Sequence, residues 1–159
     1  MKITHAPILL IENDPTDALL VQRAFRKAEL DIRVRVVSSG EAAIEYLRGD
    51  GEYGDRVAHP LPVMLVVDLK MPPPGGLEVI EWVRAQPGIK RLPVVVLSSS
   101  RDSHDVDRAY DAGASSYLVK PVAFDALQMM LTTFGHYWLN YNTPPFLGAK
   151  PEGRQFHAR

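Results

Sequence analysis

The chain has 159 residues, of which 46% are hydrophobic and 23% are charged, and its formal net charge is −1. This composition predicts one globular domain rather than a disordered, fibrous or membrane protein, and the near-neutral charge gives no basic surface for nucleic acid. No apolar run approaches the roughly 18 residues of a membrane span, the first residues lack the apolar core of a signal peptide, and cysteine is absent. We therefore expect a cytoplasmic protein that binds neither nucleic acid nor membranes and has no disulfide or thiolate site.

Five short apolar runs predict the strands of one sheet. Four of them are continuous, which is typical of parallel strands buried on both faces. These are residues 8–11, 63–67, 94–97 and 117–119. The remaining run, residues 32–37, alternates arginine with aliphatic residues and indicates an edge strand with one wet face.

Helical patterns lie between these runs. Asp14 followed by Pro15 predicts an N-cap and a first helical residue, and this helix runs to about Ala28. Ser38 with Glu41 has the spacing of a capping box and predicts the start of the next helix. Three further helices are predicted over residues 76–84, 102–113 and 124–141.

Strands that alternate with helices five times predict an α/β fold, a doubly wound (βα)5 sheet with right-handed crossovers. We expect residues 6–141 to form this domain, with an extended C-terminal helix, and residues 142–159 to form a mobile tail. The Gly- and Pro-rich stretch 49–62 is expected to be a surface loop.

Polar side chains follow several of the predicted strands, at the sheet edge where such folds bind their ligands. They are Glu12, Asn13 and Asp14 after the first strand, and Asp68, Ser98 and Lys120 at the ends of three others. Clustered carboxylate and carbonyl oxygens suit Mg²⁺, while a hydroxyl and an ammonium suit a phosphoryl group. A carboxylate can itself accept that group as an acyl phosphate.

Three motifs at these positions together resemble the bacterial response-regulator receiver domain over roughly residues 6–140. "DLKMPPPGG" has the pattern D-x-x-M-P-x-x-x-G from Asp68 to Gly76, "VVVLS" ends on Ser98, and "YLVKP" contains Tyr117 and Lys120. The resemblance implies that Asp68 is the phosphoacceptor and that Ser98 and Lys120 contact the phosphoryl group. The register from the preceding proline favours Ser98 over its serine neighbours. Tyr117 is either a switch residue together with Ser98 or a simple half-buried aromatic.

The resemblance further implies strand order 2-1-3-4-5, a cis bond between Lys120 and the proline after it, and a Mg²⁺ site. Its ligands would be Glu12, Asn13, Asp68 and the backbone carbonyl of Lys70. Typical receivers have an acidic residue where this chain has Asn13, so we expect a dipole to replace a full charge and metal binding to be weaker. Asp14 either helps to hold the ion or caps the following helix.

We therefore expect a single-domain response regulator of a two-component system, phosphorylated on Asp68 by a sensor histidine kinase. Too few residues follow Lys120 for a DNA-binding effector domain. Self-phosphorylation from a phosphohistidine donor and autodephosphorylation are the only reactions expected, so the protein would not be an enzyme in the usual sense. The alternative is a degenerate receiver that binds a partner without phosphorylation, motivated by Asn13. A phosphohydrolase is less favoured because Lys70 replaces its usual second carboxylate.

Aromatic residues are concentrated near the C-terminus. They are Phe134, Tyr137, Trp138 and Tyr141, which share one helical face, and Phe146. The stripe is either core or a partner surface, and Leu127, Met130 and Leu131 already supply a core face. We therefore predict a homodimer through this helix and the segment after it. The long loop and this helix resemble receivers that accompany phytochrome-type photosensor kinases, which implies a stand-alone, dimeric protein and a bacteriophytochrome as its kinase.

Overall fold

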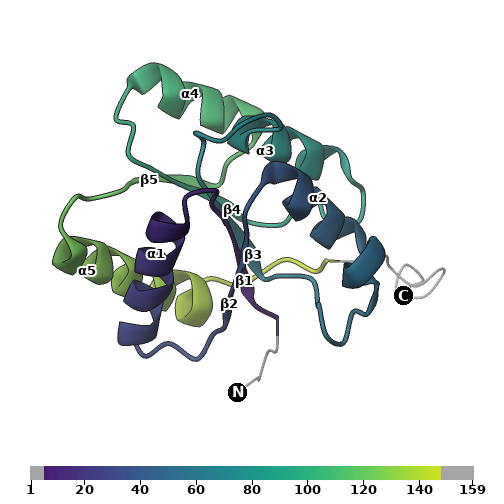
Figure 1. The fold of residues 1–159 in the computed structure, drawn as a ribbon, viewed down its shortest axis with the longest axis horizontal. Coiled ribbons are helices and arrows are strands. Elements are labelled where there is room, and N and C mark those ends of the chain that lie inside the picture. Colours follow the sequence, from purple (N-terminus) through teal and green to yellow (C-terminus); the bar gives the residue numbers. More distant parts are fainter. Residues whose placement is uncertain (1–5, 148–159) are drawn as a thin grey trace, which may run out of the picture.

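The computed structural model describes residues 6–147, and a five-stranded parallel sheet lies at its centre (Figure 1). The strands are β1 (Ile8–Ile11), β2 (Val34–Val37), β3 (Met64–Val67), β4 (Val94–Ser98) and β5 (Ser116–Val119). Their order is β2-β1-β3-β4-β5, and every neighbouring pair is parallel. The predicted fold class and strand order are confirmed.

Helices cover both faces of the sheet (Figure 1). They are α1 (Pro15–Lys27), α2 (Gly40–Arg48), α3 (Gly76–Ala85), α4 (Ser103–Ala112) and α5 (Phe124–Gly135). One face carries α1 and α5, and the other carries α2, α3 and α4. In the part of the chain that is described, none of these helices has the length and apolar character needed to cross a membrane.

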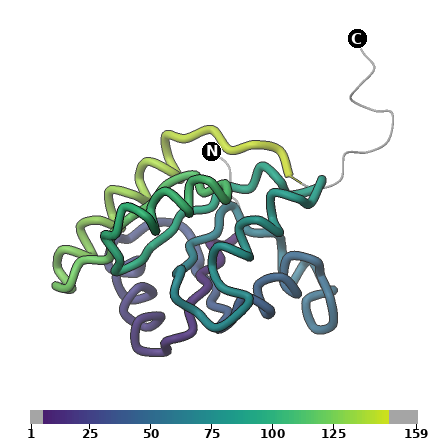
Figure 2. Tube along the Cα trace, turned by 90° about the horizontal axis from the view of Figure 1, so that it is seen from above, coloured from purple at the N-terminus to yellow at the C-terminus, as the bar shows by residue number. Residues whose placement is uncertain are grey.

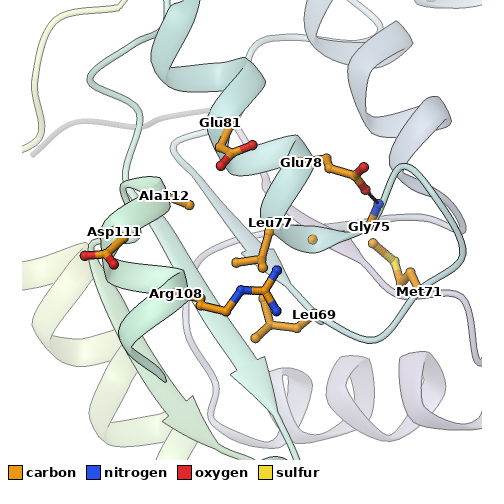
Figure 3. Close-up of a pocket in the computed structure, with 10 residues that line it drawn as sticks. Leu69, Met71, Gly75, Leu77, Glu78, Glu81, Arg108, Asp111 and Ala112 are labelled. Carbon is orange, nitrogen blue, oxygen red and sulfur yellow. Dashed lines mark hydrogen bonds between the residues drawn. The ribbon is translucent and has the colours of Figure 1, made fainter. Parts of the chain in front are cut away.

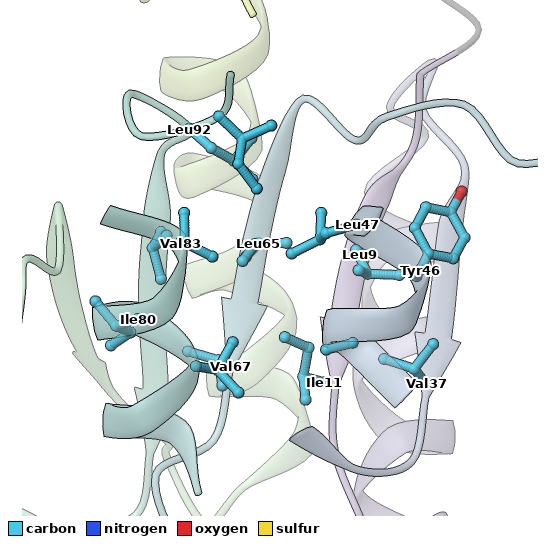
Figure 4. Close-up of a cluster of buried hydrophobic side chains, with 14 of the residues drawn as sticks. Leu9, Ile11, Val37, Tyr46, Leu47, Leu65, Val67, Ile80, Val83 and Leu92 are labelled. Carbon is cyan, nitrogen blue, oxygen red and sulfur yellow. The ribbon is translucent and has the colours of Figure 1, made fainter. Parts of the chain in front are cut away.

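The central strands contribute side chains to two separate cores, one on each face of the sheet, which explains their continuous apolar runs. Leu9 and Ile11 point into the core beneath α2 and α3, seen in Figure 4. Ile8 and Leu10 point into the opposite core, beneath α1 and α5. All four side chains are at most 2% exposed, as expected for strands that have no wet face.

The first two helices begin at capping residues, and one of the two predictions was wrong. Asp14 caps α1, and its carboxylate accepts a 2.9 Å hydrogen bond from the amide of Thr16. The cap of α2 is Ser39 rather than Ser38, and its hydroxyl accepts from the amide of Ala42 at 3.0 Å. Tertiary packing sets the residue at which α2 begins, because the first helical residue is Gly40, where any Cβ would collide with the carbonyl of Pro74.

The C-terminal helix changes its winding before its predicted end. The α-helical part stops at Gly135, and a π-helical segment continues over His136–Tyr141. Beyond it the chain passes the residues that precede β3 and β4 and crosses from one face of the sheet to the other, since Trp138 packs on the α1/α5 core and Leu147 on the opposite core. Figure 2 shows this yellow segment leaving α5 and crossing the top of the view. Most of the predicted tail, residues 148–159, lies outside the described residues.

The loop 49–62 is anchored to α2. Tyr53 packs against Tyr46 with ring centroids 5.0 Å apart. Arg56 donates hydrogen bonds of 2.7 and 2.6 Å to the carbonyls of Tyr46 and Leu47, which lie in the last turn of α2. The side chain of one loop residue therefore adds donors at the carboxyl end of α2, where the Tyr46 carbonyl also accepts from the Gly49 amide at 3.2 Å.

A second arginine joins α3 to its neighbours. The guanidinium of Arg84 donates to the carbonyls of Lys90 and Leu92, before β4, at 2.8 and 2.7 Å. It also donates at 2.8 Å to the carbonyl of Gly113, the left-handed residue that ends α4. Arg84 thus ties the carboxyl end of α4 to α3 and to the approach to β4.

Candidate functional site

The ammonium group of Lys120 lies among three carboxylates at the carboxyl ends of the strands. Its Nζ is 3.2 Å from Glu12 Oε1, 3.3 Å from Asp17 Oδ2 and 3.5 Å from Asp68 Oδ2. Glu12 follows β1, Asp68 follows β3 and Lys120 follows β5, while Asp17 lies in the first turn of α1. The side-by-side pairing of β1 with β3 sets the first two carboxylates next to each other.

This cluster is mostly buried and carries excess negative charge. The side chains of Glu12, Asp68 and Lys120 are 3%, 12% and 13% exposed, whereas that of Asp17 is 39% exposed. Three negative charges against one positive charge leave two negative charges in excess. Burial raises the pKa of Glu12. Burial alone would lower the pKa of Lys120, but the carboxylates of Asp68, Glu12 and Asp17 outweigh it and raise that pKa.

The backbone fixes Asp68 on both sides. Its amide donates to the carbonyl of Ile11 at 3.2 Å, and its Oδ1 accepts a 3.2 Å hydrogen bond from the amide of Lys70. Gly76 then packs directly against the Asp68 carbonyl, in a space that would not admit a Cβ. The closing glycine of the predicted motif is therefore required by packing.

A hydrogen-bonded chain connects Ser98 with Tyr117 and α4. The buried hydroxyl of Ser98 accepts from the amide of Ser100 at 3.2 Å, and the Tyr117 hydroxyl donates to the Ser100 carbonyl at 3.0 Å. The Ser100 hydroxyl in turn donates to the carboxylate of Asp105 at 2.6 Å, which lowers the pKa of that carboxyl. Lys70 lies 3.9 Å from the same carboxylate.

The oxygen donors near Asp68 suit a hard divalent cation. The carboxylates of Glu12 and Asp68, which both contact Lys120, are ligands of the type that such an ion prefers, and the excess negative charge is complementary to a cation. Asn13, which is exposed and directly follows Glu12, and Lys70, two residues after Asp68, carry carbonyl oxygens of the same ligand class. Among the described residues, no three His, Cys, Asp or Glu side chains converge as a metal-binding group. Asp14 is exposed, and its carboxylate accepts hydrogen bonds from the first amides of α1. Of the two roles considered for Asp14, its position therefore fits the helix cap.

Asp17 was missed from the sequence. It lies on the third helical residue after the cap Asp14, where an acidic residue is ordinarily explained by the helix dipole. The available signal was its place in the first turn of a helix that directly follows a site strand. A first-turn side chain there can reach the strand ends, as the contact with Lys120 shows.

The C-terminal aromatics divide into buried and exposed residues. The prediction that Phe134 contacts a partner subunit is wrong. Phe134 is 7% exposed and packs edge-to-face on Phe25, with the ring centroids 6.2 Å apart. The core face of α5 simply extends one turn past Leu131. Trp138 is partly buried against the same core. The remaining three, Tyr137, Tyr141 and Phe146, are 52%, 79% and 60% exposed.

Two other features lie beside the site. The prediction of a cis bond before Pro121 is wrong: the described residues have their cis X-Pro bond between Pro73 and Pro74.

A groove between α3 and α4 has an apolar floor that includes Leu69 and Leu77, with Arg108 extending across it (Figure 3). None of the predicted site residues lines this groove.

Comparison with known proteins agrees with this geometry. A family model described as the response regulator receiver domain matches residues 8–132. The probable methanogenesis regulatory protein FilR2 of Methanothrix harundinacea is 36% identical, over 87% of this chain and 86% of its own. Response regulator Rcp1 of Synechocystis is 33% identical, over 87% of this chain and 92% of its own. The crystal structure of the Mn²⁺-bound form of Rcp1 has a TM-score of 0.78, and the match covers 88% of this chain and 99% of that structure. The phosphorylated cyanobacterial phytochrome response regulator RcpA is 32% identical, with a TM-score of 0.81 over 89% of this chain and 99% of its own.

Proposed function

The chain belongs to the response regulator receiver family of two-component systems, and from this premise we propose that Asp68 accepts the phosphoryl group. The carrying observation is that Asp68 is the more exposed of the two strand-end carboxylates beside the Lys120 ammonium. Its side chain is 12% exposed against 3% for Glu12, lies 3.5 Å from the ammonium and is oriented by the amide of Lys70. The alternative of a degenerate, phosphorylation-independent receiver is not favoured, since a phosphorylated relative has the same fold.

The proposed reaction is a transfer from a phosphohistidine. An oxygen of the Asp68 carboxylate attacks phosphorus, a P–O bond forms, the P–N bond breaks, and the electron pair stays on the imidazole, which takes a proton from water. The Lys120 ammonium donates to one phosphoryl oxygen, and the Ser98 hydroxyl donates to another. A Mg²⁺ ion bound by Glu12, Asn13, Asp68 and the Lys70 carbonyl would neutralise charge on those oxygens, and the Mn²⁺-bound form of Rcp1 supports a divalent ion here.

Ser98 and Tyr117 form the proposed switch. When the Ser98 hydroxyl turns to the phosphoryl group, it releases the Ser100 amide that it now accepts from. Ser100 also holds the Tyr117 hydroxyl through its carbonyl. A change at Ser98 is therefore passed to Tyr117 through a single intervening residue.

We propose a phytochrome-type sensor histidine kinase as the phosphoryl donor, and the cytoplasm, where ATP supplies such kinases, as the place of transfer. RcpA supports this partner because it is named a phytochrome response regulator and matches nearly all of its length. FilR2 is named for a different process, so the kinase rather than the fold decides the signal.

We also propose a homodimer through the exposed aromatics Tyr137, Tyr141 and Phe146. Large exposed aromatic side chains are the type that dominates interface energy. They lie on the receiver domain's last helical turn and on the segment from residue 142 onward, which passes the amino ends of the strands. Asp68 lies at the opposite ends, so this contact leaves it open to the kinase.

Phosphotransfer from a purified bacteriophytochrome kinase with labelled ATP tests the function. We expect wild type and Asp125→Asn, an exposed acidic residue on α5, to take up label, and Asp68→Asn to take up none. Label on Asp68→Asn at the wild-type rate would show that another residue accepts the group.

A further inference from the structure

We infer that Asp17 is a positioning residue for phosphoryl acceptance: it holds the Lys120 ammonium on the α1 side of the site and releases it when a phosphoryl group arrives. This inference rests on the proposed function, because it needs Lys120 to contact a phosphoryl group on Asp68. None of the receiver motifs of this chain includes Asp17, and only the folded structure brings Asp17 to the site.

Two of the three N–H groups of the ammonium are engaged by Glu12 and Asp17, and the third faces Asp68. A lysine ammonium has three N–H groups, and three carboxylates lie within 3.5 Å of Lys120 Nζ. Asp17 and Glu12 are closer to Nζ than Asp68 is, at 3.3 and 3.2 Å against 3.5 Å. Glu12 and Asp17 therefore hold the ammonium away from Asp68, and a phosphoryl oxygen on Asp68 that draws Nζ closer competes with these two carboxylates.

Asp17 is the carboxylate that can give the ammonium up. Glu12 is 3% exposed, so losing the ammonium would leave a buried charge without its cation, which is strongly unfavourable. Asp17 is 39% exposed, so water can replace the ammonium, and an ion pair of that kind adds little stability. The difference in burial makes Asp17 the releasable partner and Glu12 the permanent one.

Asp17 lies at a place in the fold where a negative charge is favoured. It lies in the first turn of α1, whose start is fixed by the Asp14 cap and Pro15, and a helix N-terminus favours an anion. Its carboxylate therefore adds to the negative potential around Asp68 whether or not Lys120 is bound. Such a charge attracts divalent cations and repels anionic phosphoryl donors, while it also competes for the ammonium.

Replacing Asp17 by asparagine should therefore have two opposite effects. Mg²⁺ binding should weaken about threefold, because one nearby negative charge is lost. Beryllofluoride, an anionic phosphoryl analogue that binds the acceptor aspartate, should bind about threefold more tightly at saturating Mg²⁺, because Lys120 is free to contact it. A merely structural role for Asp17 would weaken both.

The experiment measures Mg²⁺ affinity by calorimetry and beryllofluoride binding by ¹⁹F NMR on wild type, Asp17→Asn and Asp17→Glu. The glutamate variant keeps the charge and should keep the wild-type Mg²⁺ affinity. The matched control is Asp125→Asn, which removes an exposed first-turn acid from α5 that makes no ion pair within residues 6–147. It should change neither affinity.

The opposed pair of shifts supports the inference, and any other pattern for Asp17→Asn overturns it, including equal weakening of both affinities or no change. Asp68→Asn separates this result from the proposed function. If Asp68→Asn binds beryllofluoride as wild type does, the proposed acceptor is wrong. If wild type binds it, Asp68→Asn does not, and Asp17→Asn shows no opposed shifts, only the role of Asp17 fails.

Discussion

Gly76 lies so close to Asp68 that a Cβ at position 76 would be 2.5 Å from the Asp68 carbonyl oxygen. The same Cβ would be 2.9 Å from the Cα of Leu69, and neither backbone atom can move aside alone. We expect Gly76→Ala to lower the free energy of unfolding by about 1–3 kcal/mol and to slow phosphoryl acceptance by displacing Asp68. Urea unfolding and phosphorylation by a small donor measure the two effects. Gly54→Ala, whose Cβ would lie 3.4 Å from the Gly49 carbonyl oxygen, should leave acceptance unchanged. An unaffected Gly76→Ala would disprove the packing argument.

Asn13→Asp is expected to strengthen Mg²⁺ binding. The substitution places a formal negative charge at the exposed position that directly follows Glu12, where the wild-type side chain offers only an amide dipole. A partly solvated charge at this position should be worth about 1 kcal/mol, or roughly fivefold in Kd. Calorimetric titration measures it, and Asn140→Asp adds the same charge on the far C-terminal segment as a control. Equal affinity in wild type and Asn13→Asp would mean that the ion does not lie beside position 13.

Tyr141→Ser is expected to weaken the homodimer without unfolding the protomer. Tyr141 is 79% exposed, so its loss removes interface area and little of the core, whereas Trp138 is partly buried and would confuse the two effects. Truncation of a central interface aromatic typically costs about 2 kcal/mol, or roughly thirtyfold in Kd. Sedimentation velocity with Tyr110→Ser on α4 as the control gives the measurement. A monomeric wild type at tens of micromolar, or an unchanged Tyr141→Ser dimer, contradicts the proposed interface.

The burial of the Tyr46 phenol should make the free energy of unfolding fall at alkaline pH. Its ring is 1% exposed and its hydroxyl donates to the Pro60 carbonyl at 2.9 Å, and burial raises its pKa despite nearby arginines. Because the folded pKa is above the unfolded value of about 10, this contribution is complete below pH ~10 and is lost as the pH rises through the folded pKa.

The measurement is the free energy of unfolding of wild type and Tyr46→Phe as a function of pH. At pH 8 the variant should be less stable by about 1 kcal/mol, since the Pro60 carbonyl loses its donor. The gap should narrow above pH ~10, where only wild type has this phenol to ionise. Tyr110→Phe, which removes a half-exposed hydroxyl on α4, is the matched control. A constant gap for Tyr46→Phe would show that the buried phenol is not the cause.

The sequence predicted the elements and the strand-end residues because both depend on local pattern. Buried strands such as Ile8–Ile11 are continuous apolar runs, and Glu12, Asp68 and Lys120 directly follow strands, so a parallel sheet brings them together. The strand order came from the resemblance, since periodicity does not say which strands are neighbours.

Tertiary contacts decided what local pattern could not. Two adjacent serines allow two caps, and the approach of Gly40 to Pro74 selected Ser39. Phe134 was assigned to a partner because helical spacing does not show where the core ends, and Phe25 of α1 extends that core. Asp17 was invisible for a similar reason, since its partner Lys120 is distant in the chain and meets it only in the folded protein.

The contacts of Arg84 determine how α4 can move. The carboxyl end of this helix is held through the carbonyl of Gly113, while its first turn is joined through Asp105 to Ser100 and so to Ser98. A helix fixed at one end and displaced at the other rotates about the fixed end. Phosphorylation would then tilt α4 rather than translate it, with the displacement growing from residue 112 toward residue 103, and a partner that distinguishes the two states would do so at the amino-terminal turn.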